Sequence, residues 1–231
     1  MRHRFSMISR VSSPARRARA REQREGTRRE ILAAADRFLR ERPYRELSVE
    51  VVMAETGLTR TAFYRHFDDA TDLVLRLLAE VGSELYPIAE RWGAKAGSNY
   101  PVAALEGLRA IVEFFARNGP LVRAIADAAA TDDQIERAYR GALETFIGIT
   151  TQTLDRLAQD GRLSVPDTRA LARALNLMNE AYLLDEFGDG EGDPRVALAT
   201  LRTVWLGAIG QPLDGERVGR LEPVSDRHAD A

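Results

Sequence analysis

Residues 48–67 read SVEVVMAETGLTRTAFYRHF, and this stretch decides how the rest of the chain is interpreted. The pattern predicts two short helices, because Ser48 and Thr59 are good N-caps for the residues that follow them. Gly57 predicts the tight turn between the helices, since glycine readily adopts the left-handed conformation that ends a helix. Two short helices joined in this way are typical of a helix-turn-helix, whose second helix enters the major groove of DNA.

The predicted second helix has an apolar face and a polar face. Phe63 and Phe67 are four residues apart and share the apolar face, which we expect to pack on the first helix of the chain. On the polar face, Arg60 suits a guanine edge, and Tyr64 offers both a ring and a hydroxyl. His66 is interpreted either as a phosphate donor or as an ordinary residue at the end of a helix. The predicted DNA-binding residues are Ser48, Thr59, Arg60, Thr61, Tyr64, Arg65 and His66.

Charge is unevenly distributed along the 231 residues, whose formal net charge is −2. Residues 1–67 hold 16 arginines against 8 acidic residues, a net charge of +8, so the remainder carries −10. This asymmetry favours a nucleic-acid-binding end, although a solvated basic tail on an acidic protein is the simpler alternative. The chain has no cysteine and no apolar run of about 18 residues. We therefore expect a cytoplasmic protein with no membrane span, disulfide or cofactor.

Apolar residues recur at helical spacing through most of the chain and predict an all-α protein with no strand. Pro87 is expected to kink or end its helix, because proline lacks a backbone N–H. The expected helices cover about 27–42, 49–56, 60–67, 69 into the eighties, 101–117, 120–130, 132–160, 167–187 and 194–210.

The domain boundaries follow from this helical pattern. Residues 1–23 are expected to form a disordered basic arm, and residues 212–231 a disordered tail. Residues 24–70 are expected to form an N-terminal three-helix helix-turn-helix DNA-binding domain. Residues 71–211 are expected to form a C-terminal helical domain for effector binding and dimerisation.

Residues 27–78 resemble the DNA-binding domain of the TetR family of bacterial repressors. Three positions depart from the family pattern: Met53 and Thr56 replace small alanines at the helix crossing, and Ala70 replaces a lysine that often binds a phosphate. The resemblance implies a homodimer whose two recognition helices bind a near-palindromic operator of double-stranded DNA. The matching positions are Ile31-Leu32, Ala34-Ala35, Phe38, Tyr44, Ser48-Val49, Gly57, the run Ala62–Phe67, and Leu73.

The body contains one unusual helix, the run LARALNLMNE at residues 171–180. Asn176 and Asn179 are three apart, so they lie on the same side of an otherwise apolar helix. Each buried amide left without a hydrogen bond would cost about 1–3 kcal/mol. The amides therefore either bond to neighbouring backbone or orient a ligand in an apolar pocket.

This body also resembles a mycobacterial branch of the same family. The resemblance implies a long, mostly apolar tunnel that binds a hydrophobic small-molecule effector. For Phe114 and Phe146 the alternative is simple core packing, and for Trp205 it is packing at a dimer interface. The resemblance assigns to the ligand site Phe114, Tyr139, Phe146, Ile149, Thr150, Asn176, Asn179 and Trp205.

Other functional classes have little support in the sequence. There are only three histidines, no two of them share a helix face, and no glycine-rich phosphate loop is present. We therefore predict neither an enzyme nor a metal site. The function expected is a ligand-responsive transcriptional repressor; a non-specific architectural DNA-binding protein and a TetR-type activator remain alternatives.

Overall fold

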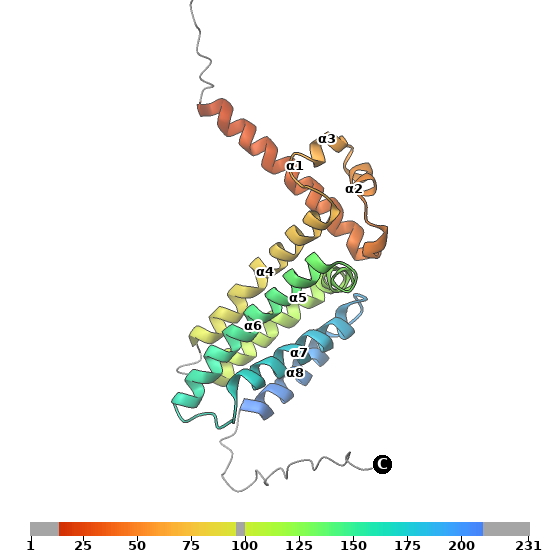
Figure 1. Ribbon diagram of the computed structural model, residues 1–231. Helices are drawn as coiled ribbons and strands as arrows, with labels where there is room; N and C mark the ends of the chain where they lie inside the picture. Colours follow the sequence, from red (N-terminus) through yellow and green to blue (C-terminus); the bar gives the residue numbers. More distant parts are fainter. Residues whose placement is uncertain (1–13, 96–99, 210–231) are drawn as a thin grey trace, which may run out of the picture. The chain divides into compact units, whose positions relative to one another are not determined.

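The computed structural model describes residues 14–95 and 100–209, and every regular element within these ranges is helical (Figure 1). The expected all-α fold is confirmed. None of the described helices combines the length and apolar character needed to cross a bilayer. In chain order, the elements are α1 Pro14–Glu41, the 3₁₀ helix η1 Tyr44–Glu46, α2 Val49–Thr56, α3 Arg60–Phe63, α4 Ala70–Lys95, α5 Tyr100–Ala129, α6 Asp133–Gln159, α7 Thr168–Phe187 and α8 Pro194–Ile209.

The chain divides into two compact units. The first comprises the described residues of Met1–Val81 together with Pro120–Tyr139. The second comprises the described residues of Gly82–Gly119 and Arg140–Ala231. The division therefore falls within α4, α5 and α6, and it differs from the boundary between residues 70 and 71 that the sequence predicts.

The core of the first unit forms where α1 packs against α2 and α3. Ile31 and Ala35 of α1 are fully buried, and Phe38 is 2% exposed. Phe63 and Phe67 meet them from the α3 segment with their ring centroids 5.4 Å apart, and both rings are buried. The predicted packing of these two aromatic rings in the core is thus confirmed, and it leaves the opposite side of α3 open.

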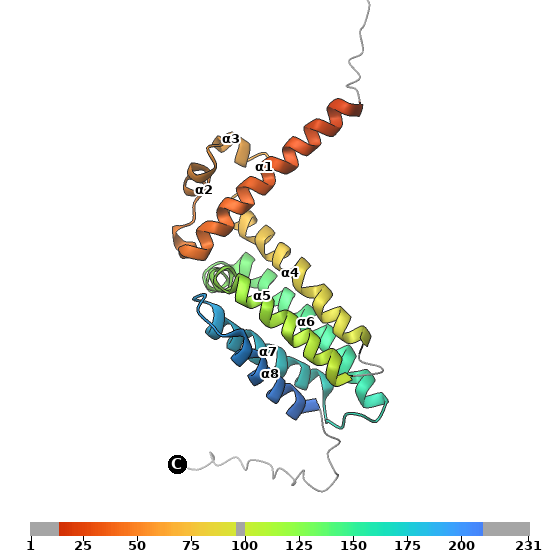
Figure 2. The ribbon, with the colours of Figure 1, turned by 180° about the vertical axis from the view of Figure 1, so that it is seen from behind.

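The first helix is longer than the sequence predicts. α1 begins at Pro14, whereas the expected start is near Thr27 (Figure 2). Residues 14–23 of the expected arm are therefore helical, because they are rich in alanine and arginine, and proline is tolerated in a first turn. Residues 1–13 and the expected tail at 212–231 lie outside the described residues.

Pro87, which was expected to kink or end its helix, lies inside a helix, and so does Pro120. Pro87 is inside α4, which continues to Lys95. Pro120 is inside α5, so the two helices expected at 101–117 and 120–130 are one. A proline in a helix interior costs about 3 kcal/mol. Burial of apolar side chains on both sides of each proline offsets that cost, as at Leu85 and Ala89 in α4.

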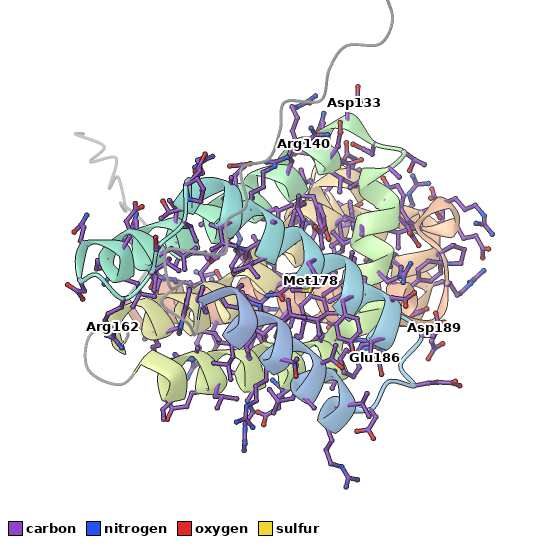
Figure 3. All side chains as sticks on the ribbon, turned by 90° about the horizontal axis from the view of Figure 1, so that it is seen from below. Asp133, Arg140, Arg162, Met178, Glu186 and Asp189 are labelled. Atoms are coloured by element: carbon purple, nitrogen blue, oxygen red, sulfur yellow. The ribbon has the colours of Figure 1, made fainter. Side chains whose placement is uncertain are left out.

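Close backbone packing holds the second unit together. A β-carbon at Gly119 of α5 would overlap the carbonyl oxygen of Phe187, at the end of α7, so no larger residue fits there without a shift. α7 also packs against α8. Figure 3 labels Met178 on α7, with Glu186 and Asp189 where the chain leaves α7 for α8. These contacts hold together α5, α7 and α8, three of the helices that line the cavity described below.

Candidate DNA interface and ligand pocket

The turn between α2 and α3 has the geometry that the sequence predicts. The Ser48 hydroxyl accepts a hydrogen bond from the Val51 N–H at 3.3 Å, and the Thr59 hydroxyl accepts one from the Ala62 N–H at 3.3 Å. Gly57 ends α2 with φ 67°, in the left-handed region. Both predicted N-caps and the predicted glycine turn are confirmed.

Met53 and Thr56, two of the departures from the family pattern, fit the crossing of these helices. Met53 is buried at 4% exposure, so its flexible side chain fills the core instead of separating the helices. The Thr56 hydroxyl donates to the Met53 carbonyl at 3.0 Å and accepts from the Leu58 N–H at 3.2 Å. Thr56 therefore stabilises the turn through two polar backbone groups.

The recognition segment is shorter as a helix than the predicted span of 60–67. α3 ends at Phe63, and a tighter turn follows in which the N–H groups of His66 and Phe67 both donate to the Phe63 carbonyl, at 2.8 and 3.0 Å. Burial of the Phe63 and Phe67 rings stabilises this turn more than a continued regular helix would. The segment still presents its polar residues on the outside: Thr59, Arg60, Thr61, Tyr64 and Arg65 are exposed, and Ser48 and His66 are half-buried.

Arg60 is held in place by its neighbours. Its Nη1 lies 2.7 Å from Oε1 of Glu50, near the start of α2, and its Nη2 donates to the Tyr64 hydroxyl at 3.4 Å. The Tyr64 hydrogen bond, followed by the Glu50 charge, raises the pKa of Arg60 further above its ordinary value. Sequence reasoning missed Glu50, because an acidic residue in a first helical turn is explained by the helix dipole alone.

The surroundings of His66 favour its neutral ring. Burial lowers its pKa below the ordinary value, and the positive charges of Arg24 and Arg28 on α1 lower it further. A phosphate beside His66 would oppose both effects and favour the protonated ring. The shift also indicates that the basic part of α1 lies within electrostatic range of the recognition segment.

The start of α4, where Ala70 replaces the family lysine, is fixed by carboxylates. The Asp69 side chain accepts from the Asp72 N–H at 2.8 Å. Asp132, before α6, accepts from the Thr71 hydroxyl at 2.8 Å and from the Tyr44 hydroxyl at 3.3 Å. Burial raises the pKa of Asp132, but hydrogen bonds from Thr71 and the backbone outweigh it and hold that pKa below its usual range.

The second unit contains a mostly apolar cavity between α4, α5, α6, α7 and α8. Its volume is about 30 Å³, enough for one or two water molecules but far smaller than a drug-sized ligand. Binding such a ligand would therefore require the surrounding helices to move apart. The lining residues are Ile88, Ala89, Trp92, Ala104, Gly107, Leu108, Ile111, Phe146, Thr150, Asn176, Asn179 and Trp205.

The polar groups of the cavity form two pairs. Asn176 donates through Nδ2 to the Thr150 hydroxyl at 3.0 Å and to the Ala172 carbonyl at 2.8 Å. Trp205 donates through Nε1 to Oδ1 of Asn179 at 2.9 Å, and both side chains are buried. The Trp205 ring also meets the Trp92 ring edge-on, with centroids 5.4 Å apart.

Five of the eight predicted pocket residues line this cavity, namely Phe146, Thr150, Asn176, Asn179 and Trp205. Phe114 instead packs edge-on against Phe115 in the core. Tyr139 belongs to the first unit, and Ile149 is not among the residues that line the cavity. These three do not contribute to the cavity wall.

The cavity residues from α4 and α5 were not predicted from sequence. Trp92 and Ile88 come from α4, and Gly107 and Ile111 from α5. A β-carbon on Gly107 would lie 3.3 Å from Cβ of Trp92, so a small residue lets the two helices approach. The one sequence signal for this close approach of α4 and α5 was a glycine within an apolar helical pattern.

The fold and the recognition segment define a helix-turn-helix transcriptional regulator. Residues 31–77 match the family "Bacterial regulatory proteins, tetR family", and residues 104–210 match "Transcriptional regulator EthR, C-terminal domain". The chain therefore belongs to the TetR family of DNA-binding regulators and carries an EthR-type C-terminal domain.

Individual relatives agree with this assignment. The "HTH-type transcriptional regulator EthR" of Mycobacterium tuberculosis is 29% identical over 213 residues, which is 88% of this chain and 96% of the relative. Its counterpart in Mycolicibacterium smegmatis is 26% identical over 214 residues, covering 89% and 96%. A putative TetR-family regulator from Syntrophomonas wolfei has the same fold, with a TM-score of 0.69, 16% identity, and coverage of 82% of this chain and 98% of that one.

Proposed function

We propose that this protein is a ligand-responsive repressor that binds a near-palindromic operator as a homodimer. In this proposal, residues 24–70 form the DNA-binding domain, and residues 71–211 bind a hydrophobic small molecule and form the dimer. The observation that carries the proposal is the recognition segment, because its aromatic rings are buried while its hydrogen-bond donors are exposed.

The mode of DNA binding follows from that segment. Arg60 is the residue we expect to contact a guanine edge, and Glu50 fixes its orientation through the 2.7 Å ion pair. Thr61, Tyr64 and Arg65 are exposed beside it. The N-terminal ends of α2 and α3, capped by Ser48 and Thr59, are suited to phosphate oxygens, and His66 is proposed to donate to a further phosphate.

Dimer formation is supported by an exposed apolar stripe on α7. Ala170, Ala174, Leu177 and Ala181 follow each other at spacings of four, three and four, so they lie on one helix face, and all four are exposed. Val196 and Val204 of the adjacent α8 are also exposed, at 54% and 41%. Small residues beside a larger aliphatic side chain allow two helices to approach closely. We propose that a second copy covers this surface, giving a symmetric contact between two pairs of α7 and α8.

The chemistry of the effector follows from the cavity. Asn176 uses its Nδ2 within the protein, whereas Nδ2 of Asn179 donates no hydrogen bond within the part of the chain that the structure describes. An apolar molecule with one acceptor, such as a carbonyl group, would satisfy that donor while its body occupies the cavity beside the two tryptophans. Because the cavity is small, the ligand must favour an expanded conformation, and this differential affinity is what alters DNA binding.

Genome-wide mapping of bound sites in the source organism, followed by affinity measurements on the sites found, tests the proposal. We expect a shared near-palindromic motif, and at least one apolar carbonyl compound that both raises the melting temperature and changes operator affinity. Increased transcription of the neighbouring genes after deletion would support repression, and decreased transcription would support activation instead. Uniform binding without a motif would indicate the architectural alternative.

A further inference from the structure

The face of α1 that packs on the DNA-binding helices changes character along its length. Ile31, Ala35 and Phe38 lie on this face and are buried in the core of the first unit. Continuing the same spacing of three and four towards the N-terminus, the face carries Arg28, Arg24, Arg21 and Arg17. One continuous face therefore holds apolar side chains over the second half of α1 and arginines over the first half. We call Arg17, Arg21, Arg24 and Arg28 the arginine stripe.

The arginine stripe contains no acidic residue, and three of its four arginines are exposed. Arg21 and Arg24 are exposed, Arg28 is half-buried, and none of these three forms an ion pair with another described residue. The glutamates of this part of α1, Glu22 and Glu25, lie on other faces of the helix, about 130° and 70° from the centre of the stripe. Arg21, Arg24 and Arg28, aligned on one face, would repel each other, so this face is suited to an anionic partner.

The position of the stripe points to DNA as that partner. α1 packs against both α2 and α3 and extends beyond them, as seen in Figure 2. Arg24 and Arg28 are close enough to His66 of the recognition segment to lower its pKa. The stripe thus continues the basic surface of the recognition segment. Its four arginines span about 16 Å at a helical rise of about 1.5 Å per residue, close to the length of five base pairs.

We propose that the arginine stripe of α1 binds the phosphates of duplex DNA flanking the bases read by α3. This inference rests on the proposed function and adds a second, sequence-independent contact to it. The stripe supplies affinity and salt dependence, whereas Arg60 and its neighbours supply sequence preference. Its helical form matters, because it places the guanidinium groups at regular intervals along one line.

Salt-dependent binding of charge-matched variants tests this inference. The test variant is Arg21→Gln with Arg24→Gln, and the matched control is Arg19→Gln with Arg29→Gln, which removes two exposed arginines of the same helix outside the stripe. The probes are a duplex selected by the wild-type protein and a mixed-sequence duplex of equal length. Each lost phosphate contact should reduce the slope of log affinity against log salt by about 0.9.

We expect the test variant to lose two contacts per protomer on both probes, which lowers the slope by about 1.8 per protomer. Its selected motif should be unchanged, and the control should keep the wild-type slope. Equal slopes for the test variant and the control would overturn the inference, whereas failure of the wild type to select any motif would instead refute the proposed function. Gly26→Pro tests the helical geometry, since it breaks α1 next to the stripe while keeping every charge. It should lower the slope as the test variant does; a wild-type slope in this variant would overturn the stripe geometry.

Discussion

Replacing Asn179 with leucine should destabilise the protein by removing the partner of a buried indole. The Nε1 group of Trp205 donates to Oδ1 of Asn179 at 2.9 Å, and the two residues are 5% and 7% exposed. Leucine has nearly the same shape as asparagine but accepts no hydrogen bond. A buried donor left without a partner costs about 1–3 kcal/mol, so the free energy of unfolding should fall by about that amount.

Urea unfolding at a fixed protein concentration measures this change. The protein has two tryptophans, Trp92 and Trp205, whose rings touch, so fluorescence reports directly on this region, and circular dichroism reports on the helices. Fixed concentration is needed because a dimer gains apparent stability as its concentration rises. The slope of unfolding free energy against urea should be unchanged, because the folded surface is the same.

A double-mutant cycle separates the hydrogen bond from general effects of packing. Trp205→Phe removes the indole donor, so adding the leucine substitution to that variant should cost less than it does in the wild type. The coupling between the two sites should be about 1 kcal/mol or more. Asn176→Leu is the comparison at the neighbouring amide. Additive effects, or wild-type stability in the leucine variant, would refute the hydrogen-bonded arrangement of the cavity.

Three further predictions concern other parts of the molecule. Leu177→Arg places a charge in the apolar stripe of α7 and should give monomers in analytical ultracentrifugation. Arg173→Ala, beside the stripe, should leave the dimer intact. A dimeric Leu177→Arg variant would exclude this surface as the dimer interface. The pKa of His66 is lowered in the free protein, and a phosphate would raise it, so DNA binding should take up a proton and strengthen as pH falls from 7.5 to 6. His66→Gln should remove this part of the pH dependence. An equally strong pH dependence in the glutamine variant would exclude the phosphate contact. Gly119→Ala should lower the free energy of unfolding by about 1–3 kcal/mol, because its β-carbon would overlap the Phe187 carbonyl. Gly141→Ala is the control and should be neutral or stabilising, because a β-carbon there meets nothing within 4 Å. Equal stabilities of the two variants would contradict the close approach of α5 and α7.

The geometry of the recognition segment could be predicted from sequence because its signals are local. An N-cap such as Ser48, a turn glycine such as Gly57 and an aromatic pair four residues apart act within a few residues of themselves. The ion pair between Glu50 and Arg60 joins two helices through the turn, and no local pattern encodes its 2.7 Å geometry.

The helix ends and the cavity depend on contacts distant in sequence. Pro87 and Pro120 carry a real local cost, but burial along the rest of each helix outweighs it, so α4 does not end at Pro87 and α5 continues through Pro120. Asn176 and Asn179 were identified by their spacing on an apolar helix and Trp205 by resemblance, whereas Trp92 and Gly107 enter the cavity only because α4 and α5 approach closely. Composition predicted a mobile arm that included residues 14–23. These residues are instead helical, because their helix propensity is high and they continue α1.

Selection of binding sites from random duplexes, carried out in parallel with the wild type and with Arg60→Ala, tests the central claim most directly. The wild type should enrich a near-palindromic motif with two half-sites. The variant should bind that motif roughly 5- to 150-fold more weakly and lose preference at one base pair, repeated symmetrically in both half-sites. A motif unchanged by the substitution, or no motif with either protein, would contradict the assignment of the recognition segment as the part that reads DNA.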